Sequence, residues 1–343
     1  MNDCITLDAK GTVSRRPMQM EEFVIIVMEE LKTRLGSNAD VRVKEVRKNN
    51  GVILTGVSVF KQGQNIAPTV YLEKMLERYN SGDEFASVVD ELVRLLSDMA
   101  MDHFDVSQFL EWEKAKDGIC YKLINRKMNE KLFSDIPHRS FLDLEIVYYY
   151  KLQADKDGLA SILIRNRFLE EWNVTEQELY EAAMNNTVLH NPYTVVSMQK
   201  MFRDMLFVDP KPRQEGDDTN WDELAREAEQ MSELDSDDEM FVLTNKGKYF
   251  GAGCLLYKEV LKKIASRLND DLIILPSSVH ETILLRASMA GNISALKLMV
   301  EEVNRSQVER EERLSDNVYK YDRSSDKMSI LMGDAEEILS EAV

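Results

Sequence analysis

Residues able to do chemistry gather in the last third of the chain. Cys254 offers a thiol, and His280 followed by Glu281 offers an imidazole beside a carboxylate. A helical zinc site of the HExxH type needs a second histidine one turn later, because only then do both rings reach the same ion; that position is Leu284. The metal motif therefore fails. The alternative is a turn histidine inside a capping box that runs from Ser278 to Glu281.

A second chemistry would pair Cys254 as nucleophile with His280 as base. A catalytic thiol needs a cation or a helix N-terminus to lower its pKa, and a cysteine buried in a strand is ordinarily inert. The sequence has no GxGxxG, GxxxxGK[ST] or GxSxG motif, so the common phosphate loops and the nucleophile elbow are absent from it. We predict no catalytic residue, no metal and no cofactor, and retain Cys254, His280 and Glu281 as the candidate site.

The elements that would position these residues form one compact unit over residues 240–287. The pattern predicts, in order, a strand at 240–243, a turn through Gly247, a return strand over 249–255, a helix over 257–268, a strand at 272–275 and a last strand before 287. The apolar run at 272–275 is typical of a strand buried on both faces. Within this unit, the Pro276 to Glu281 corner is the segment that we retain as a possible functional site.

The rest of the chain repeats this mixture of hairpins and helices. Helices are predicted at 20–35, 70–79, 83–99, 129–133 and after Thr175, where Glu178 completes a capping box. Strands are predicted at 41–46 and 52–60 around an Asn-Asn-Gly turn, at 119–124, in a long extended segment at 141–152, at 159–164, and in a final hairpin over 318–331. The fold class is therefore α+β, with antiparallel hairpins covered by helices.

Composition shifts divide the chain into two predicted domains. The segments are a lead-in at 1–17, an N-terminal α+β domain at 18–115, a C-terminal α+β domain in two parts at 116–208 and 240–331, an acidic linker at 209–239 and a tail at 332–343. The linker is a solvated connection in one interpretation. In the other it is a docking segment in which Trp221 anchors a protein partner.

Charge and cysteine content limit the partners. The net charge is −18, from 61 acidic and 43 basic residues, and such a field disfavours nucleic-acid binding. Arg42, Lys44, Arg47 and Lys48 cluster on one hairpin, which we interpret as a solvated strand face. Three cysteines without a CxxC, together with the lack of a signal peptide or a membrane-length apolar run, predict a cytoplasmic protein that does not enter a membrane.

Four strings in order resemble an uncharacterised domain-of-unknown-function family of Gram-positive, largely gut-associated bacteria (Firmicutes). They are residues 65–72 (NIAPTVYL), 137–144 (PHRSFLDL), 179–187 (LYEAAMNNT) and 274–281 (ILPSSVHE). The similarity runs from about Met20 to Ala287. It implies a bacterial cytoplasmic protein, and it carries over no activity, cofactor or catalytic residue.

Three functions follow as hypotheses. The first is a non-enzymatic binding or adaptor protein that recognises a protein partner through an exposed sheet edge, a groove or the acidic linker. The second is an enzyme of unrecognised class with its site at the Pro276 to Glu281 corner. The third, nucleic-acid binding, requires a contiguous basic patch. The sequence does not define the ligand, the partner or the oligomeric state.

Overall fold

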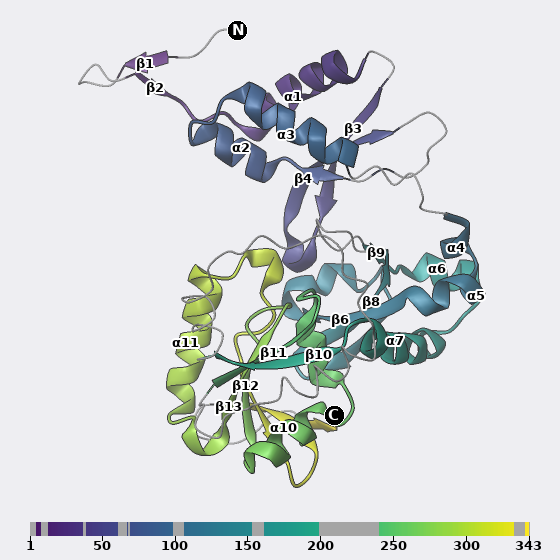
Figure 1. Ribbon diagram of the computed structural model, residues 1–343, viewed down its shortest axis with the longest axis vertical. Helices are drawn as coiled ribbons and strands as arrows, with labels where there is room; N and C mark the ends of the chain where they lie inside the picture. The colour runs from purple at the N-terminus through teal and green to yellow at the C-terminus, as the bar shows by residue number, and fades with distance from the viewer. Residues whose placement is uncertain are drawn as a thin grey trace, which may run out of the picture. The chain divides into compact units, whose positions relative to one another are not determined.

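The chain divides into two compact units, Met1–Asp105 and Val106–Val343. The computed structural model describes residues 5–7, 13–36, 39–60, 67, 69–98, 106–152, 161–198, 240–332 and 340–342. Both units combine helices with antiparallel sheets, which confirms the predicted α+β class (Figure 1). The predicted acidic linker at 209–239 lies outside the described residues, and the finer domain boundaries stay predictions.

The first unit places helices on one three-stranded sheet. Its elements are β1 (Ile5–Leu7), β2 (Val13–Arg15), α1 (Met20–Leu35), β3 (Asp40–Arg47), the 3-10 helix η1 (Asn49–Gly51), β4 (Ile53–Phe60), β5 (Val70–Tyr71), α2 (Glu73–Asn80) and α3 (Phe85–Asp98). The sheet order is β3-β4-β5, and β1 and β2 pair separately. Asn50 takes a positive φ of 58° in the hairpin turn, a conformation that asparagine accepts better than most residues.

One face of this sheet forms the core of the first unit. Val57 and Val70 are buried there beside Phe23 and Leu31 of α1 and Leu92 of α3. The helical spacing of the apolar residues therefore predicted the correct inward faces. The predicted helix at 70–79 begins later than expected, because its first two residues pair with β4 as the short strand β5.

The second unit begins with a four-stranded sheet. Its elements are α4 (Val106–Leu110), α5 (Trp112–Ala115), η2 (Lys116–Gly118), β6 (Ile119–Asn125), η3 (Lys127–Leu132), β7 (His138–Phe141), β8 (Leu144–Lys151), β9 (Ser161–Leu163), α6 (Asn166–Trp172) and α7 (Glu176–His190). The strand order is β6-β8-β7, with β9 also paired to β8. The prediction of one extended segment over 141–152 is wrong: the chain turns back at Leu142, whose φ is 51°, and Phe141 pairs with Leu144.

Helix α7 covers the outer edge of β6 with side-chain hydrogen bonds. The Thr187 hydroxyl accepts from the backbone N–H of Tyr121 (2.9 Å), and the Asn186 amide donates to the carbonyl of Ile119 (3.1 Å). The predicted capping box at the other end of α7 is confirmed. The side chains of α7 thereby satisfy backbone hydrogen-bonding groups that β6 would otherwise expose at the edge of the sheet.

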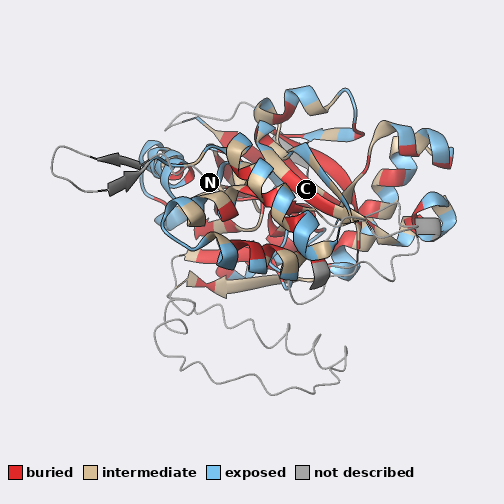
Figure 2. Cartoon of the chain, turned by 90° about the horizontal axis from the view of Figure 1, so that it is seen from above, coloured by how far each residue is buried: buried red, intermediate tan, exposed pale blue. Residues whose placement is uncertain are grey.

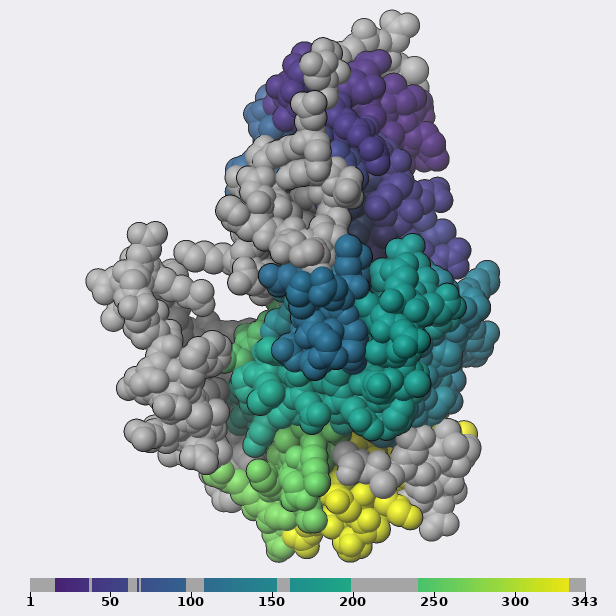
Figure 3. All heavy atoms as spheres, turned by 90° about the vertical axis from the view of Figure 1, so that its right-hand side faces the viewer, coloured from purple at the N-terminus to yellow at the C-terminus, as the bar shows by residue number. Residues whose placement is uncertain are grey.

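Aromatic packing holds the helices that precede and follow this sheet. The rings of Phe109 and Trp172 pack edge to face at 5.3 Å, and the Trp172 indole N–H donates to the carbonyl of Phe109 (3.0 Å). Phe168 joins the same cluster. Figure 3 shows the teal atoms of residues 161–198 around the blue atoms of the preceding helices. Helix α6, which contributes two of these rings, is an element that the sequence patterns did not predict.

A seven-stranded antiparallel sheet forms the rest of the second unit. Its elements are β10 (Tyr193–Ser197), β11 (Met240–Asn245), η4 (Gly251–Leu256), α10 (Val260–Leu268), β12 (Leu272–Leu275), β13 (Thr282–Arg286), η5 (Ala287–Met289), α11 (Ile293–Ser306), η6 (Arg310–Glu312), β14 (Val318–Asp322), β15 (Lys327–Leu331) and β16 (Ser340–Ala342). The strand order is β10-β11-β13-β12-β14-β15-β16.

Both faces of the seven-stranded sheet are covered. Phe241, Leu284, Ile274 and Tyr319 lie in one row across four strands, and all four are buried. The opposite face packs against α11 through residues such as Val300. Figure 2 shows the buried residues on the strands and the inner sides of the helices. The prediction that strand 272–275 is buried on both faces is therefore confirmed.

The predicted return strand at 249–255 is wrong. Strand β11 pairs with β10 and β13, and the chain after its turn forms the buried 3-10 helix η4. Lys248 and Phe250 both take positive φ angles, of 56° and 54°, which direct the chain away from the sheet. The alternation of glycine and larger residues resembled a strand, but the partners of β11 come from distant parts of the chain.

Hydroxyl groups of buried tyrosines connect the two sheets of the second unit. Tyr121 on β6 donates to the carbonyl of Gly253 in η4 (2.9 Å), and Tyr257 donates to the carbonyl of Asn191 (2.7 Å). Burial raises the pKa of both hydroxyls well above the ordinary tyrosine value. These hydroxyls are therefore neutral donors across the working pH range.

We predict that Tyr121→Phe destabilises the second unit by about 1–3 kcal/mol, because it leaves the buried Gly253 carbonyl without its donor. Tyr193→Phe is the matched control, since the half-buried Tyr193 hydroxyl has no recorded hydrogen bond in the described part of the chain. Urea denaturation of the two variants measures the difference. Equal midpoints would contradict the role assigned to the Tyr121 hydroxyl.

Candidate functional site

The Pro276 to Glu281 corner joins β12 to β13 and is held by backbone hydrogen bonds on two sides. The carbonyl of Val279 accepts from Ala252 of η4 (3.2 Å), and the N–H of Val279 donates to the carbonyl of Glu312 (2.8 Å). Further along, Ser315 donates to the carbonyl of Pro276 (2.9 Å). The corner is therefore a fixed part of the packed unit.

The predicted capping box at this corner is absent from the structure. The Ser278 hydroxyl accepts from the backbone N–H of His280 (3.0 Å), which closes a local turn, and the chain then enters β13 at Thr282. No helix begins here, so Glu281 has no helix N-terminus to cap. The interpretation of His280 as a turn histidine holds, with a serine turn in place of a helix cap.

Both ring nitrogens of His280 have partners in the structure. The backbone N–H of Phe250 donates to Nδ1 (3.3 Å), and Nε2 lies 3.5 Å from Oε1 of Glu312. Because Nδ1 accepts, the neutral ring carries its proton on Nε2, where it faces the Glu312 carboxylate. The side chain is 21% exposed. A general base at this position would first have to give up one of these contacts.

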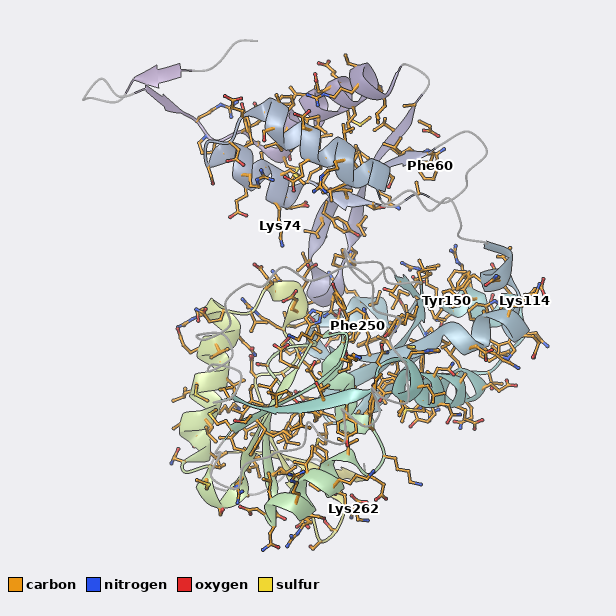
Figure 4. The ribbon with its side chains drawn as sticks, in the orientation of Figure 1. Phe60, Lys74, Lys114, Tyr150, Phe250 and Lys262 are labelled. Atoms are coloured by element: carbon orange, nitrogen blue, oxygen red, sulfur yellow. The ribbon has the colours of Figure 1, made fainter. Side chains whose placement is uncertain are left out.

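Phe250 is the centre of an aromatic cluster next to the corner (Figure 4). Its ring stacks on His280 at 5.9 Å, meets Tyr149 of β8 edge to face at 5.2 Å, and lies 4.2 Å from the Lys122 ammonium of β6. Tyr249 meets His280 edge to face, with the ring centres 6.2 Å apart, and is 42% exposed. The cluster thus connects the two sheets of the second unit and reaches the surface at Tyr249.

Cys254 lies in η4 and is fully buried. Its thiol donates to the carbonyl of Thr244 (3.4 Å), and burial raises its pKa to about 12. Thr244 also contacts the corner, because its hydroxyl donates to the carbonyl of His280 (2.7 Å). The fold thus brings Cys254 and His280 to the same threonine, but the thiol and the imidazole are not bonded to each other. The thiol bonds to the Thr244 carbonyl, and the imidazole contacts Phe250 and Glu312. Cys254 is therefore a core residue, and its thiol is not activated as a nucleophile.

The two remaining candidates add little chemistry to the corner. Glu281 is half-buried at the start of β13. Trp221 lies outside the described residues. Among the described residues, no group of three or more histidine, cysteine, aspartate or glutamate side chains could hold a metal ion.

Sequence reasoning missed a half-buried acidic centre around Asp143. This carboxylate accepts from the hydroxyl of Ser315 (2.7 Å), the amide of Asn317 (2.9 Å) and the hydroxyl of Tyr319. Asp143 follows Leu142 in the turn between β7 and β8 and belongs to the string 137–144 that carried the family resemblance. Asp143 is the acidic residue of that string and stands between Leu142 and Leu144, and this was the signal that could have identified it.

A fully buried carboxylate lies close to Asp143 in the chain. Glu145 is 3% exposed and accepts from Arg126 (2.5 Å) and from the hydroxyl of Ser140 (3.0 Å). Among the described residues, the donors to Glu145 lie in or next to the four-stranded sheet, whereas those to Asp143 come from β14 and the segment before it, so Asp143 joins the two sheets. The arrangement acts as a structural polar network.

A model of a family of unknown function, DUF5688, matches residues 20–323. The chain belongs to DUF5688. The match covers the N-terminal sheet, the four-stranded sheet and most of the seven-stranded sheet, so the DUF5688 region includes both units. A search of curated proteins and a search of solved structures each found no match. No helix in the described part of this DUF5688 chain is long and apolar enough to cross a membrane.

We predict that Cys120 and Cys254 resist alkylation in the folded protein. Both are buried free thiols, and burial raises their pKa values to about 11 and about 12. Unfolded cysteine has a pKa of about 8.5, so at pH 8.5 half of the unfolded thiols are thiolates but very few of the folded ones. Raising the pH above 8.5 therefore lowers the free energy of unfolding, because these two thiols ionise more readily in the unfolded state. Mass spectrometry after iodoacetamide treatment, with and without guanidinium, measures the difference, and rapid native labelling of Cys254 would restore it as a candidate nucleophile.

We predict that Gly251→Ala destabilises the protein by about 2–4 kcal/mol. A Cβ at Gly251 would lie 2.2 Å from the carbonyl oxygen of His280 and 2.2 Å from the Thr244 hydroxyl, so the corner and η4 would have to separate. Gly247→Ala is the matched control, because a Cβ there meets only the Asn245 side chain, at 3.6 Å. Thermal unfolding compares the two, and equal loss would show that the close approach is not needed.

Proposed function

We propose that this DUF5688 protein is a non-enzymatic protein-binding protein that takes an extended segment of its partner onto the edge of β3. The observation that carries the proposal is the free edge itself. Strand β3 is eight residues long, pairs with β4 without interruption and, within the described ranges, has a strand partner on one side only. A regular edge strand of this length is a template for an added strand.

The hydrogen bonds around the hairpin decide which backbone groups of β3 point outward. Lys48 donates to Val52 across the hairpin (2.7 Å), while the carbonyl of Thr55 accepts from Leu72 on the β5 side (3.0 Å). In an antiparallel pair such bonding alternates, so the even-numbered residues of β3 bond to β4 and the odd-numbered ones face away. The outward N–H and C=O groups therefore include those of Val43, Glu45 and Arg47.

One edge strand of the second unit, β6, gives a contrast that supports this choice. The edge of β6 is covered by Thr187 and Asn186 of α7. In the first unit, the charged side chains of β3 discourage aggregation, but within the described ranges no strand pairs with the side of β3 that faces away from β4. Protein recognition through backbone pairing needs such an open strand.

The alternative function is an enzyme with its site at the Pro276 to Glu281 corner. The pairing of His280 with Glu312 is the feature that favours it. Against it, both imidazole nitrogens are engaged and the neighbouring Cys254 thiol is buried with a raised pKa.

We also propose that the protein is cytoplasmic. The free thiols of Cys120 and Cys254 agree with a reducing compartment.

The substitution Glu45→Pro tests the edge directly. Proline removes an N–H that points outward while leaving the β4 hydrogen bonds in place, and it is tolerated at strand edges. We predict that a partner retrieved by the wild-type chain from a lysate of the source organism is lost with Glu45→Pro and kept with Glu45→Ala, which changes the same side chain but retains the N–H. The melting temperature should fall by less than about 8 °C, the shift that roughly 1 kcal/mol produces in a small domain.

A third variant separates the edge from the acidic segment. Deleting residues 213–238 removes the segment in which Trp221 would act as an anchor. Loss of the partner on this deletion, with no effect of Glu45→Pro, would move the docking site from β3 to the segment. Equal capture by all variants would refute both.

A further inference from the structure

The first unit exposes one face of its three-stranded sheet. The opposite face forms the core, so the side chains of β3 alternate between core and surface. The surface side carries cations and aromatic rings, and we call it the basic sheet face: Arg42, Lys44, Lys48, Phe60 and Tyr71. Figure 4 labels Phe60 at the end of β4.

Cations on this face are held on aromatic rings. The Arg42 guanidinium lies 4.2 Å from the centre of the Phe60 ring, and the Lys48 ammonium lies 4.0 Å from that of Tyr71. Arg42 remains 62% exposed. A cation stacked in this way keeps its charge toward solvent while its position is restricted, so it loses less conformational entropy when an anion binds.

The middle of the face is closely packed. Lys44 pairs with Gly56, and a Cβ on Gly56 would lie 2.4 Å from the Thr69 methyl group and 3.3 Å from a Val46 methyl group. Ser58 is buried there and shares a hydroxyl hydrogen bond of 2.8 Å with Thr69. The exposed side chains lie on β3, so a ligand beside β3 can reach Arg42 and Lys44.

The charge of the face is opposite to that of the chain. The protein carries −18 in total, but among the described residues the face has three cations, and the carboxylate of Asp40 there is paired with Arg42. Lys44 is exposed and makes no ion pair recorded among the described residues. A long polyanion would meet the repulsive field of the whole chain, whereas a short acidic segment would meet mainly the local cations.

The geometry points to an acidic extended peptide as the partner of β3, with carboxylates at alternate positions; this inference rests on the proposed function. Side chains of an added strand alternate between the two faces of the sheet. Those on the basic sheet face meet Arg42 and Lys44, and those on the other face meet Val41 and Val43, which pack at the margin of the core. The preferred segment therefore alternates acidic and apolar residues.

Fluorescence anisotropy with the full chain tests the partner chemistry. The probes are fluorescein-labelled octapeptides that alternate valine with glutamate, serine or lysine. We expect the glutamate peptide to bind most tightly and the lysine peptide most weakly. Lys44→Glu should weaken the glutamate peptide about tenfold and strengthen the lysine peptide, because one attractive charge pair becomes repulsive. Lys263→Glu, an exposed lysine on α10, is the matched control and should change neither.

The outcomes separate this inference from the proposed function. The proposed function, and the inference with it, is overturned if any peptide binds Glu45→Pro and Glu45→Ala equally. It is also overturned if no peptide binds. Loss of binding in Glu45→Pro alone, with equal affinities for the glutamate and serine peptides or equal effects of Lys44→Glu and Lys263→Glu, overturns only the acidic partner. Tighter binding of a labelled single-stranded oligothymidylate than of the glutamate peptide would assign the face to nucleic acid instead.

Discussion

The buried hydroxyl groups of tyrosine are the constraint on which the second unit depends. Each must find an acceptor away from water, because an unpaired buried hydroxyl costs about 1–3 kcal/mol. Tyr121 and Tyr257 find backbone carbonyls, and Tyr319 finds Asp143. The bonds of Tyr121 and Tyr319 fix η4 and the seven-stranded sheet against the four-stranded sheet, and the bond of Tyr257 joins the end of η4 to the end of α7. The Pro276 to Glu281 corner is rigid because it is bonded to the same η4.

The polar groups that first looked reactive are used by the fold. His280 accepts from Phe250 and faces Glu312, and Cys254 donates to Thr244. The first unit shows the reverse arrangement. Its β3 strand carries charged and apolar residues, and half of its backbone groups face away from β4. The proposed function therefore depends on these outward backbone groups and not on a reactive side chain.

Local patterns in the sequence predicted the elements whose partners lie nearby. The β3–β4 hairpin, α1, the capping box at Thr175 and the strand at 272–275 follow from spacing and turn residues. The missed turn at Leu142 is local and was hidden because leucine rarely takes a positive φ. The failure at 249–255 has another cause, which is pairing over long distances. Strand β11 joins β10 and β13, so the residues from 249 onward form η4. Likewise, nothing within a few residues of Asp143 indicates that Ser315 and Tyr319 bind it, since they come from β14 and its approach.

The bonding of α7 to β6 has a mechanical consequence. Two neighbouring helix residues, Asn186 and Thr187, bond to backbone groups of the strand at Ile119 and Tyr121, so the helix can neither slide along the strand nor rotate about its own axis without breaking both. A load on the four-stranded sheet would pass directly into α7 and on to Asn191, which bonds to Tyr257. The strand, the helix and the start of the second sheet are therefore expected to move together as one rigid group.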